Sequence, residues 1–177
     1  GMEEFQEGAI FIDGKEVNIK SPLDSIAHGI GMVHQHFMLL SSLTVAENVV
    51  LGMEPMRHGV FDMNEAIRMT QEIADKYRFN IDARSKVGDL SVGMMQKVEI
   101  LKALIKGGKV LILDEPTAVL TPQEAWRLFE ILENLRRDGK SIVFISHRLN
   151  EVMEISDRIS VMRRGEAVGT LSRGEWN

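Results

Sequence analysis

The order of apolar and polar positions along the chain predicts short strands near both of its ends. Apolar and polar residues alternate on either side of Asp13-Gly14, a dipeptide that favours the tight turn of a β-hairpin. A similar pattern surrounds Arg164-Gly165, and residues 29–33 form a short apolar run that predicts a further strand. We therefore expect a β-hairpin at each end of the chain and at least one strand between them.

The second half of the chain alternates between apolar runs and helical periodicity. Residues 110–113 and 141–145 are apolar runs, typical of parallel strands that are buried on both faces of a sheet. Apolar residues recur at helical spacing after Ser91, and again after Thr121 and Glu124, which form a capping box. This strand–helix–strand order predicts an α/β fold, in which crossover helices connect the strands of a parallel sheet.

Residues 41–89 differ in character from the segments on either side of them. Thr44 and Glu47 form a capping box, which predicts the start of a helix, and a second amphipathic helical pattern follows after a loop rich in Pro and Gly. We interpret this block as a mainly helical subdomain that is inserted into an α/β core. On this interpretation, the core consists of residues 1–40 and 90–177.

The composition is that of an ordinary globular protein of 177 residues, with 44% hydrophobic residues and no cysteine. This length fits one domain with a modest insertion, and the lack of cysteine excludes disulfides and thiolate metal sites. A formal net charge of -5 offers no basic surface, so we do not expect a nucleic acid partner. The apolar runs are far too short to cross a bilayer, so any role at a membrane requires a partner protein.

Two carboxylates in succession, Asp114 and Glu115, directly follow the apolar run at residues 110–113. They would lie at the carboxyl edge of the sheet, where parallel α/β folds bind their ligands. Asp114 could hold Mg²⁺, usually through water, and Glu115 could polarise a water molecule for attack on a phosphoryl group. The alternative is structural, because acidic residues commonly begin the loop that follows a strand.

Other polar residues occupy comparable places. Gln35 and His147 each follow a predicted strand, so a Gln carbonyl oxygen could ligate Mg²⁺, and the His could reach a terminal phosphate. Ser91 and Gly93 lie at a predicted helix N-terminus, where free backbone N–H groups and the helix dipole suit an anion. Each residue taken alone is more often structural: a lone His is usually not catalytic, and Ser is an ordinary N-cap.

In this order and spacing, these residues resemble the nucleotide-binding domain of ABC transporters. The resemblance places Gln35 in the Q-loop, Ser91 and Gly93 in the signature motif (Leu-Ser-Val-Gly-Met at residues 90–94), and Asp114 at the end of the Walker B strand. It also implies that Glu115 is the catalytic glutamate and His147 the switch histidine of an ATPase. The fold implied is part of a P-loop NTPase-like core with an inserted helical subdomain. ATP and Mg²⁺ are the implied cofactors, bound between two such domains.

Four segments narrow the resemblance to the import ATPases for simple sugars and nucleosides, which carry two such domains in tandem. These segments are residues 33–38, 43–48, 98–103 and 116–124, and the chain resembles the first of the two domains from about residue 1 to residue 169. The family implies a membrane-embedded permease, an extracytoplasmic solute-binding protein and a peripheral position on the cytoplasmic face of the cell membrane. Large apolar residues at 37–40 are expected to contact the permease, unless all four lie in the core.

The sequence also departs from the family pattern. Val92 and Met94 replace Gly and Gln of the general signature Leu-Ser-Gly-Gly-Gln, and Thr121 replaces the aspartate of the D-loop. No Gly-x-x-x-x-Gly-Lys-[Ser/Thr] phosphate loop is present, because Asn134 stands where Gly139-Lys140-Ser141 would need its first Gly. We therefore expect the chain to begin just downstream of this motif, and to be inactive as an ATPase by itself.

Two other functions stay open at this stage. A non-catalytic interaction module would keep the fold and its docking surface, which the missing loop favours, but it would leave Glu115 and His147 without a role. A soluble ABC ATPase of DNA repair or translation usually carries long coiled-coil insertions or basic stretches, and this chain has neither. Whether a phosphate loop is encoded upstream of residue 1 discriminates between the module and the enzyme.

Overall fold

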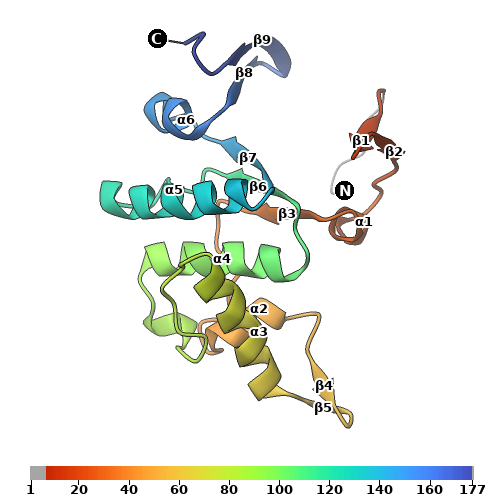
Figure 1. Ribbon diagram of the computed structural model, residues 1–177, viewed down its shortest axis with the longest axis vertical. Helices are drawn as coiled ribbons and strands as arrows, with labels where there is room; N and C mark the ends of the chain where they lie inside the picture. The colour runs from red at the N-terminus through yellow and green to blue at the C-terminus, as the bar shows by residue number, and fades with distance from the viewer. Residues whose placement is uncertain (1–6, 177) are drawn as a thin grey trace.

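A three-stranded parallel sheet lies at the centre of the structure, a computed structural model that describes residues 7–176 (Figure 1). Its strands are β3 (Ile30–Val33), β6 (Val110–Asp114) and β7 (Ser141–Ile145), in the order β3-β6-β7. The parallel sheet and the crossover helices predicted from the sequence are confirmed. The segments ascribed to residues 1–6 by resemblance lie outside the described residues.

Helices α4 (Val92–Ile105) and α5 (Pro122–Arg137) lie side by side next to this sheet (Figure 1). Leu111 and Leu113 of β6 are fully buried in the core that these helices share with the sheet. The alternate residues of β6 are only half-buried, and Val143 of β7 is 47% exposed. The prediction that residues 110–113 and 141–145 are buried on both faces is therefore wrong, because within residues 7–176 helices cover only one face.

The elements between residues 41 and 89 are mainly helical: α2 (Val45–Val50), α3 (Met63–Lys76) and the short 3₁₀ helix η1 (Val87–Asp89). Both halves of the capping box between Thr44 and Glu47 are formed at the start of α2, as predicted. A small hairpin, β4 (Met56–Arg57) and β5 (Val60–Phe61), replaces the expected loop. Its turn at His58 and Gly59 has positive φ at both residues. That residues 41–89 form a separate subdomain stays a prediction.

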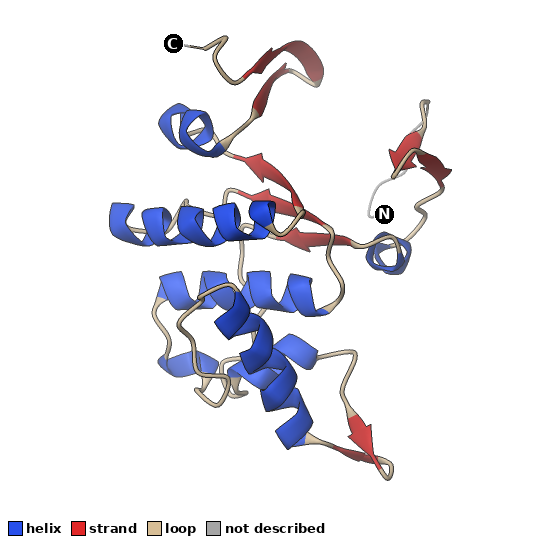
Figure 2. Cartoon of the chain, viewed as in Figure 1, coloured by secondary structure: helices blue, strands red, loops and turns tan. Residues whose placement is uncertain are grey.

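Both terminal hairpins are present, as the turn dipeptides predicted. The remaining elements are β1 (Ile10–Ile12), β2 (Lys15–Val17), α1 (Pro22–Ala27), α6 (Leu149–Ile155), β8 (Arg158–Arg163) and β9 (Glu166–Ser172). The hairpins β1–β2 and β8–β9 stand apart from the central strands in Figure 2, and neither pairs with them within residues 7–176. In the described part, no helix is long and apolar enough to cross a membrane.

A polar contact joins the end of α3 to the end of α5. Asp138, which follows α5, accepts hydrogen bonds from the Tyr77 hydroxyl and from Lys76 Nζ, the latter at 2.8 Å. The bonds from Lys76 and Tyr77 lower the pKa of Asp138, whereas burial raises the pKa of Tyr77. These bonds fix residues 76–77 against the core helix.

Candidate functional site

The carboxyl ends of the three central strands bring Gln35, Glu115 and His147 together. Gln35 Nε2 donates to Glu115 Oε2 over 3.2 Å, and His147 Nδ1 lies 3.2 Å from Glu115 Oε1. Both carboxylate oxygens of Glu115 are thus in contact with a polar side chain from a different strand end. The Glu115 side chain is 30% exposed and that of His147 is 70% exposed, so solvent reaches the group. Residues that are far apart in the sequence here form one cluster.

The backbone of Glu115 is in an unusual conformation. Its φ is 47°, in the left-handed region that residues other than glycine rarely adopt. Two hydrogen bonds hold this conformation: Glu115 N–H donates to Ile145 O over 2.9 Å, and Ala118 N–H donates to Glu115 O over 3.1 Å. Left-handed residues persist where the surroundings impose them, and they concentrate at functional sites. In this conformation the Glu115 side chain contacts Gln35 and His147.

Asp114 ends β6 directly before Glu115 and is half-buried. A carboxylate from Asp114 and an amide oxygen from Gln35 are the hard oxygen ligands that Mg²⁺ prefers. Residues 7–176 contain no group of three or more His, Cys, Asp or Glu side chains that could hold a metal by themselves. Mg²⁺ at phosphate sites takes only one or two protein ligands, with water and phosphate oxygens completing its shell. The donor set of this edge therefore fits Mg²⁺ bound together with a nucleotide.

Ser91 and Gly93 lie at the N-terminus of α4, as predicted. Ser91 Oγ accepts a hydrogen bond from the Met94 N–H over 3.3 Å. A side chain at Gly93 would require Glu124 to shift, because an added Cβ would lie 2.5 Å from Glu124 Oε1. The backbone N–H and hydroxyl of Thr121, and to a smaller extent the Gly93 N–H, lower the pKa of Glu124. Glu124, which the sequence predicts as part of a capping box, therefore also touches the N-terminus of α4.

The predicted site residues form two separate groups. Within the described part of the chain, no hydrogen bond or ion pair joins Ser91 or Gly93 to Gln35, Glu115 or His147. The structure thus brings together the residues that follow the strands, whereas Ser91 and Gly93 line a small cavity that none of those residues lines.

Sequence reasoning missed the role of Arg148, which holds the two loops of the first group together. Arg148 Nη1 donates to Thr117 O over 3.1 Å, and Nη2 donates to Ala118 O over 3.2 Å. The loop that carries His147 is therefore tied to the loop that follows Glu115. An arginine directly after His147 was the only available signal, because the bonded carbonyls lie about thirty residues away in sequence.

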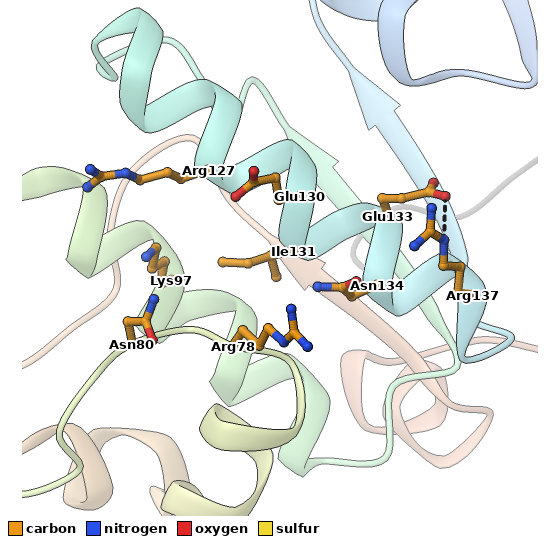
Figure 3. Close-up of a pocket in the computed structure, with 9 residues that line it drawn as sticks. All are labelled: Arg78, Asn80, Lys97, Arg127, Glu130, Ile131, Glu133, Asn134 and Arg137. Atoms are coloured by element: carbon orange, nitrogen blue, oxygen red, sulfur yellow. Dashed lines mark hydrogen bonds and ion pairs between the residues drawn. The ribbon is translucent and has the colours of Figure 1, made fainter.

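Two cavities lie near α4 and α5. The larger, about 650 Å³, runs between α5 and residues 78–80, and contains none of the predicted site residues (Figure 3). Its lining mixes arginines with glutamates around Lys97, whose Nζ donates to Phe79 O over 2.9 Å. Burial, and then the nearby Arg127, lower the pKa of Lys97. The smaller cavity, about 90 Å³, is lined by Ser91, Gly93 and Glu124 among others, and is the one that includes predicted residues.

Comparison with known proteins gives consistent results. The family model described as ABC transporter matches residues 1–118. The guanosine import ATP-binding protein NupO of Bacillus subtilis is 48% identical over 100% of this chain, which spans 35% of that protein. The nucleoside import ATP-binding protein NupA of Lactococcus lactis is 44% identical over 99% of this chain, and the chain again spans 35% of its relative. The glucose import ATP-binding protein TsgD13 of Haloferax volcanii is 46% identical over 99% of this chain and is 37% covered. The chain thus spans about a third of the length of these curated relatives.

Solved structures show the same likeness. A nucleotide-free ATP-binding cassette from an ABC transporter superposes with a TM-score of 0.81 at 25% identity, covering 97% of this chain and 72% of that one. The dimeric structure of a bacterial ABC transporter cassette gives a TM-score of 0.78 at 25% identity and covers 99% of this chain and 77% of that one. The expected α/β fold of ABC ATPase cassettes is confirmed. With a family model that matches more than half of its length, the chain belongs to the ABC transporter family, as an ATPase domain.

Proposed function

We propose that this chain is part of the ATP-hydrolysing subunit of an importer for a simple sugar or a nucleoside. The observation that carries the proposal is the convergence of Gln35 and His147 on the carboxylate of Glu115, at the carboxyl edge of a parallel sheet. The relatives named above support the choice of solute, because they are described as importing guanosine, nucleosides and glucose.

Glu115 is the proposed general base. Its carboxylate is positioned to polarise a water molecule for attack on the terminal phosphate of ATP. His147 Nδ1 and Gln35 Nε2 each contact one oxygen of this carboxylate, so both residues orient the base and lie beside the reacting water. These two contacts orient the Glu115 carboxylate before any substrate binds.

Asp114 and Gln35 are the proposed ligands of Mg²⁺. Asp114 offers its carboxylate at the end of β6, and Gln35 offers an amide oxygen, since its Nε2 is the atom that donates to Glu115. When bound, Mg²⁺ neutralises the charge of the phosphate oxygens. Asp114 and Glu115 thus have separate tasks, one binding the metal and the other orienting water.

Ser91 and Gly93 are proposed to bind the nucleotide of a second ATPase domain. Their backbone N–H groups lie at the N-terminus of α4, where the helix dipole attracts a phosphate. Their separation from the Glu115 group supports this arrangement, because a ligand between two domains would meet one group from each. One of the similar solved structures is a dimeric ABC transporter cassette, which supports the pairing of two such domains.

The proposed partners are membrane-embedded permease subunits, and indirectly an extracytoplasmic solute-binding protein. Met38 is 64% exposed and Leu40 is 49% exposed, whereas Leu39 packs against the core. The alternative that all of residues 37–40 lie in the core is therefore wrong. Two exposed apolar side chains close to Gln35 support a permease contact there, with the subunit on the cytoplasmic face of the cell membrane.

One experiment on Mg-ATP tests the function. The 177-residue chain contains no phosphate loop, so Asp114 and Glu115 would face a polyanion without the Lys and backbone N–H groups that offset their charge. We expect calorimetric titration to detect no micromolar binding to this chain. A subunit in which a phosphate loop precedes the chain should bind and hydrolyse ATP.

In that loop-bearing subunit, E115Q should keep ATP binding and lower the steady-state turnover by about 100-fold or more. E130Q, which removes a carboxylate on the surface of α5, is the matched control and should leave turnover unchanged. Turnover of E115Q within a few-fold of the unchanged subunit would assign the base to another residue. A loop-bearing subunit that binds ATP but never hydrolyses it would favour the non-catalytic module.

A further inference from the structure

The main-chain groups of Met38 are bound by two charged side chains of α4. Met38 N–H donates to Glu99 Oε1 over 2.5 Å, and Lys102 Nζ donates to Met38 O over 2.8 Å. Residues 37–40 have no regular secondary structure. These side chains therefore supply the hydrogen-bond partners that a neighbouring strand would give to the backbone of Met38. The contact joins residues more than sixty positions apart in the sequence.

Glu99 and Lys102 also interact with each other. Glu99 Oε2 lies 3.6 Å from Lys102 Nζ, and the two side chains are only 8% and 19% exposed. The three contacts form a closed ring, from the Met38 N–H through both side chains and back to the Met38 carbonyl. Charged groups are rarely buried unless they are paired and hydrogen-bonded, and this ring satisfies both requirements. The pair therefore serves the backbone of Met38 rather than the surface of the protein.

A second side chain holds the same segment from α2. Asn48, 1% exposed, accepts from the Leu40 N–H over 2.7 Å and donates to Leu40 O over 3.0 Å. With Leu39 packed in the core, the backbone on both sides of it is fixed, while the side chains of Met38 and Leu40 point to solvent. A segment held in this way moves together with the helices that hold it.

We infer that Glu99 and Lys102 are positioning residues that couple the segment after Gln35 to the N-terminus of α4. The inference rests on the proposed function, in which residues 37–40 meet a permease and Ser91 and Gly93 meet a nucleotide. Glu99 is eight residues after Ser91 in sequence, which is about 12 Å along an α-helix. A displacement of Met38 by a partner is thus passed to a rigid helix whose other end bears the phosphate-binding groups.

A purely structural role for the pair is the alternative, and a double substitution separates the two. In E99L/K102M both charges are removed together, so neither is left without its partner, while the Met38 N–H and carbonyl lose their hydrogen bonds. E65L/R68M on α3 is the matched control, because Glu65 and Arg68 form an ion pair with the same spacing that touches neither Met38 nor α4. The effects of E99Q should lie between those of E99L/K102M and those of the control, because its amide oxygen still accepts from the Met38 N–H.

Amide hydrogen exchange in the intact ATP-binding subunit tests the contact itself. In E99L/K102M the amide of Met38 should exchange about tenfold faster, as expected for the loss of one charge-assisted hydrogen bond. The Leu40 N–H, which donates to Asn48 Oδ1, is the internal control, and its exchange rate should not change. Unchanged exchange at Met38 would overturn the inference at its first step.

ATP hydrolysis with and without the permease tests the coupling. E99L/K102M should lower the ratio of permease-stimulated to basal turnover by about tenfold, while basal turnover and KM stay within about twofold. The control E65L/R68M should keep the unchanged ratio. Faster exchange at Met38 with an unaltered ratio of stimulated to basal turnover would show that Glu99 and Lys102 have only a structural role, and would overturn the inference. If the unchanged subunit hydrolyses no ATP, the proposed function fails. The hydrogen-exchange measurement would still test the contact between Met38 and Glu99.

Discussion

The Glu124 side chain restricts which residue can occupy position 93, which lies close to it in space. Its Oε2 accepts from the N–H and hydroxyl of Thr121, both over 3.0 Å, and so caps α5. Its Oε1 lies over Gly93, at the N-terminus of α4. A side chain at position 93 would displace this carboxylate, and the displacement is expected to weaken its bonds to Thr121 at the start of α5. The glycine of the signature segment thus has a steric cause within this chain.

A double-substitution cycle tests this steric coupling. In an otherwise unchanged chain, G93A gains up to about 1 kcal/mol of helix propensity but displaces Glu124, so we expect little net change or a slight loss of stability. E124A alone should cost about 1 kcal/mol through the loss of the cap. In G93A/E124A the propensity gain is no longer opposed, so denaturant unfolding should show a positive coupling between the two sites. Strictly additive effects would show that Glu124 moves aside freely.

Sequence patterns predicted local contacts and failed for distant ones. The capping boxes at Thr44 and Thr121 were readable because both partners lie within one turn of helix. Glu124 contacts Gly93, and Glu99 contacts Met38. Both contacts depend on how the helices pack, which the hydrophobic periodicity of the sequence does not specify. For the same reason the candidate residues Gln35, Glu115 and His147 could be assigned to strand ends, but their mutual contacts had to come from the structure.

At the scale of one element, the start of α2 depends on an ionised carboxylate. Glu47 Oε2 accepts from the Thr44 N–H and from its hydroxyl, both over 2.7 Å. The backbone bond from Thr44, and then the hydroxyl bond, lower the pKa of Glu47 below its ordinary value of 4.5. The four buried apolar residues of α2, among them Val45 and Val49, rest on the helix that this cap begins.

The capping carboxylate makes part of the stability depend on pH. Since the folded pKa of Glu47 is depressed, its contribution is fully present above the unfolded pKa and is lost as pH falls through the folded value. E47Q should therefore be less stable than the unchanged chain by about 1 kcal/mol at pH 7, and the difference should shrink in acid. Thermal unfolding between neutral and acidic pH measures this, with E16Q on the exposed strand β2 as the control for losing one carboxylate. A difference that is the same at every pH would contradict the assignment.

At the scale of the whole molecule, the central sheet has one face covered by helices and one face that nothing covers within residues 7–176. Met32, Ile112 and Val143 lie in one row across β3, β6 and β7. Met32 is 42% exposed and Val143 is 47% exposed. Parallel sheets are ordinarily covered on both faces, and the long apolar runs of β6 and β7 led to the same expectation here. The sequence could not reveal the open face, because an apolar run in a strand looks the same whether or not a helical layer covers it.

An apolar row that is exposed in this way should drive the 177-residue chain to associate with itself. The hydrophobic effect favours removing this row from water, and in a pure sample another copy of the chain supplies the apolar surface that covers it. We expect light scattering after gel filtration to give a mass above that of one chain, 19.9 kDa, rising with concentration. M32K/V143K places a charge at each end of the row and should return the mass toward a monomer. V161K/M162K, at two exposed apolar positions of β8, is the control; if it lowers the mass equally, the open face of the central sheet is not the contact.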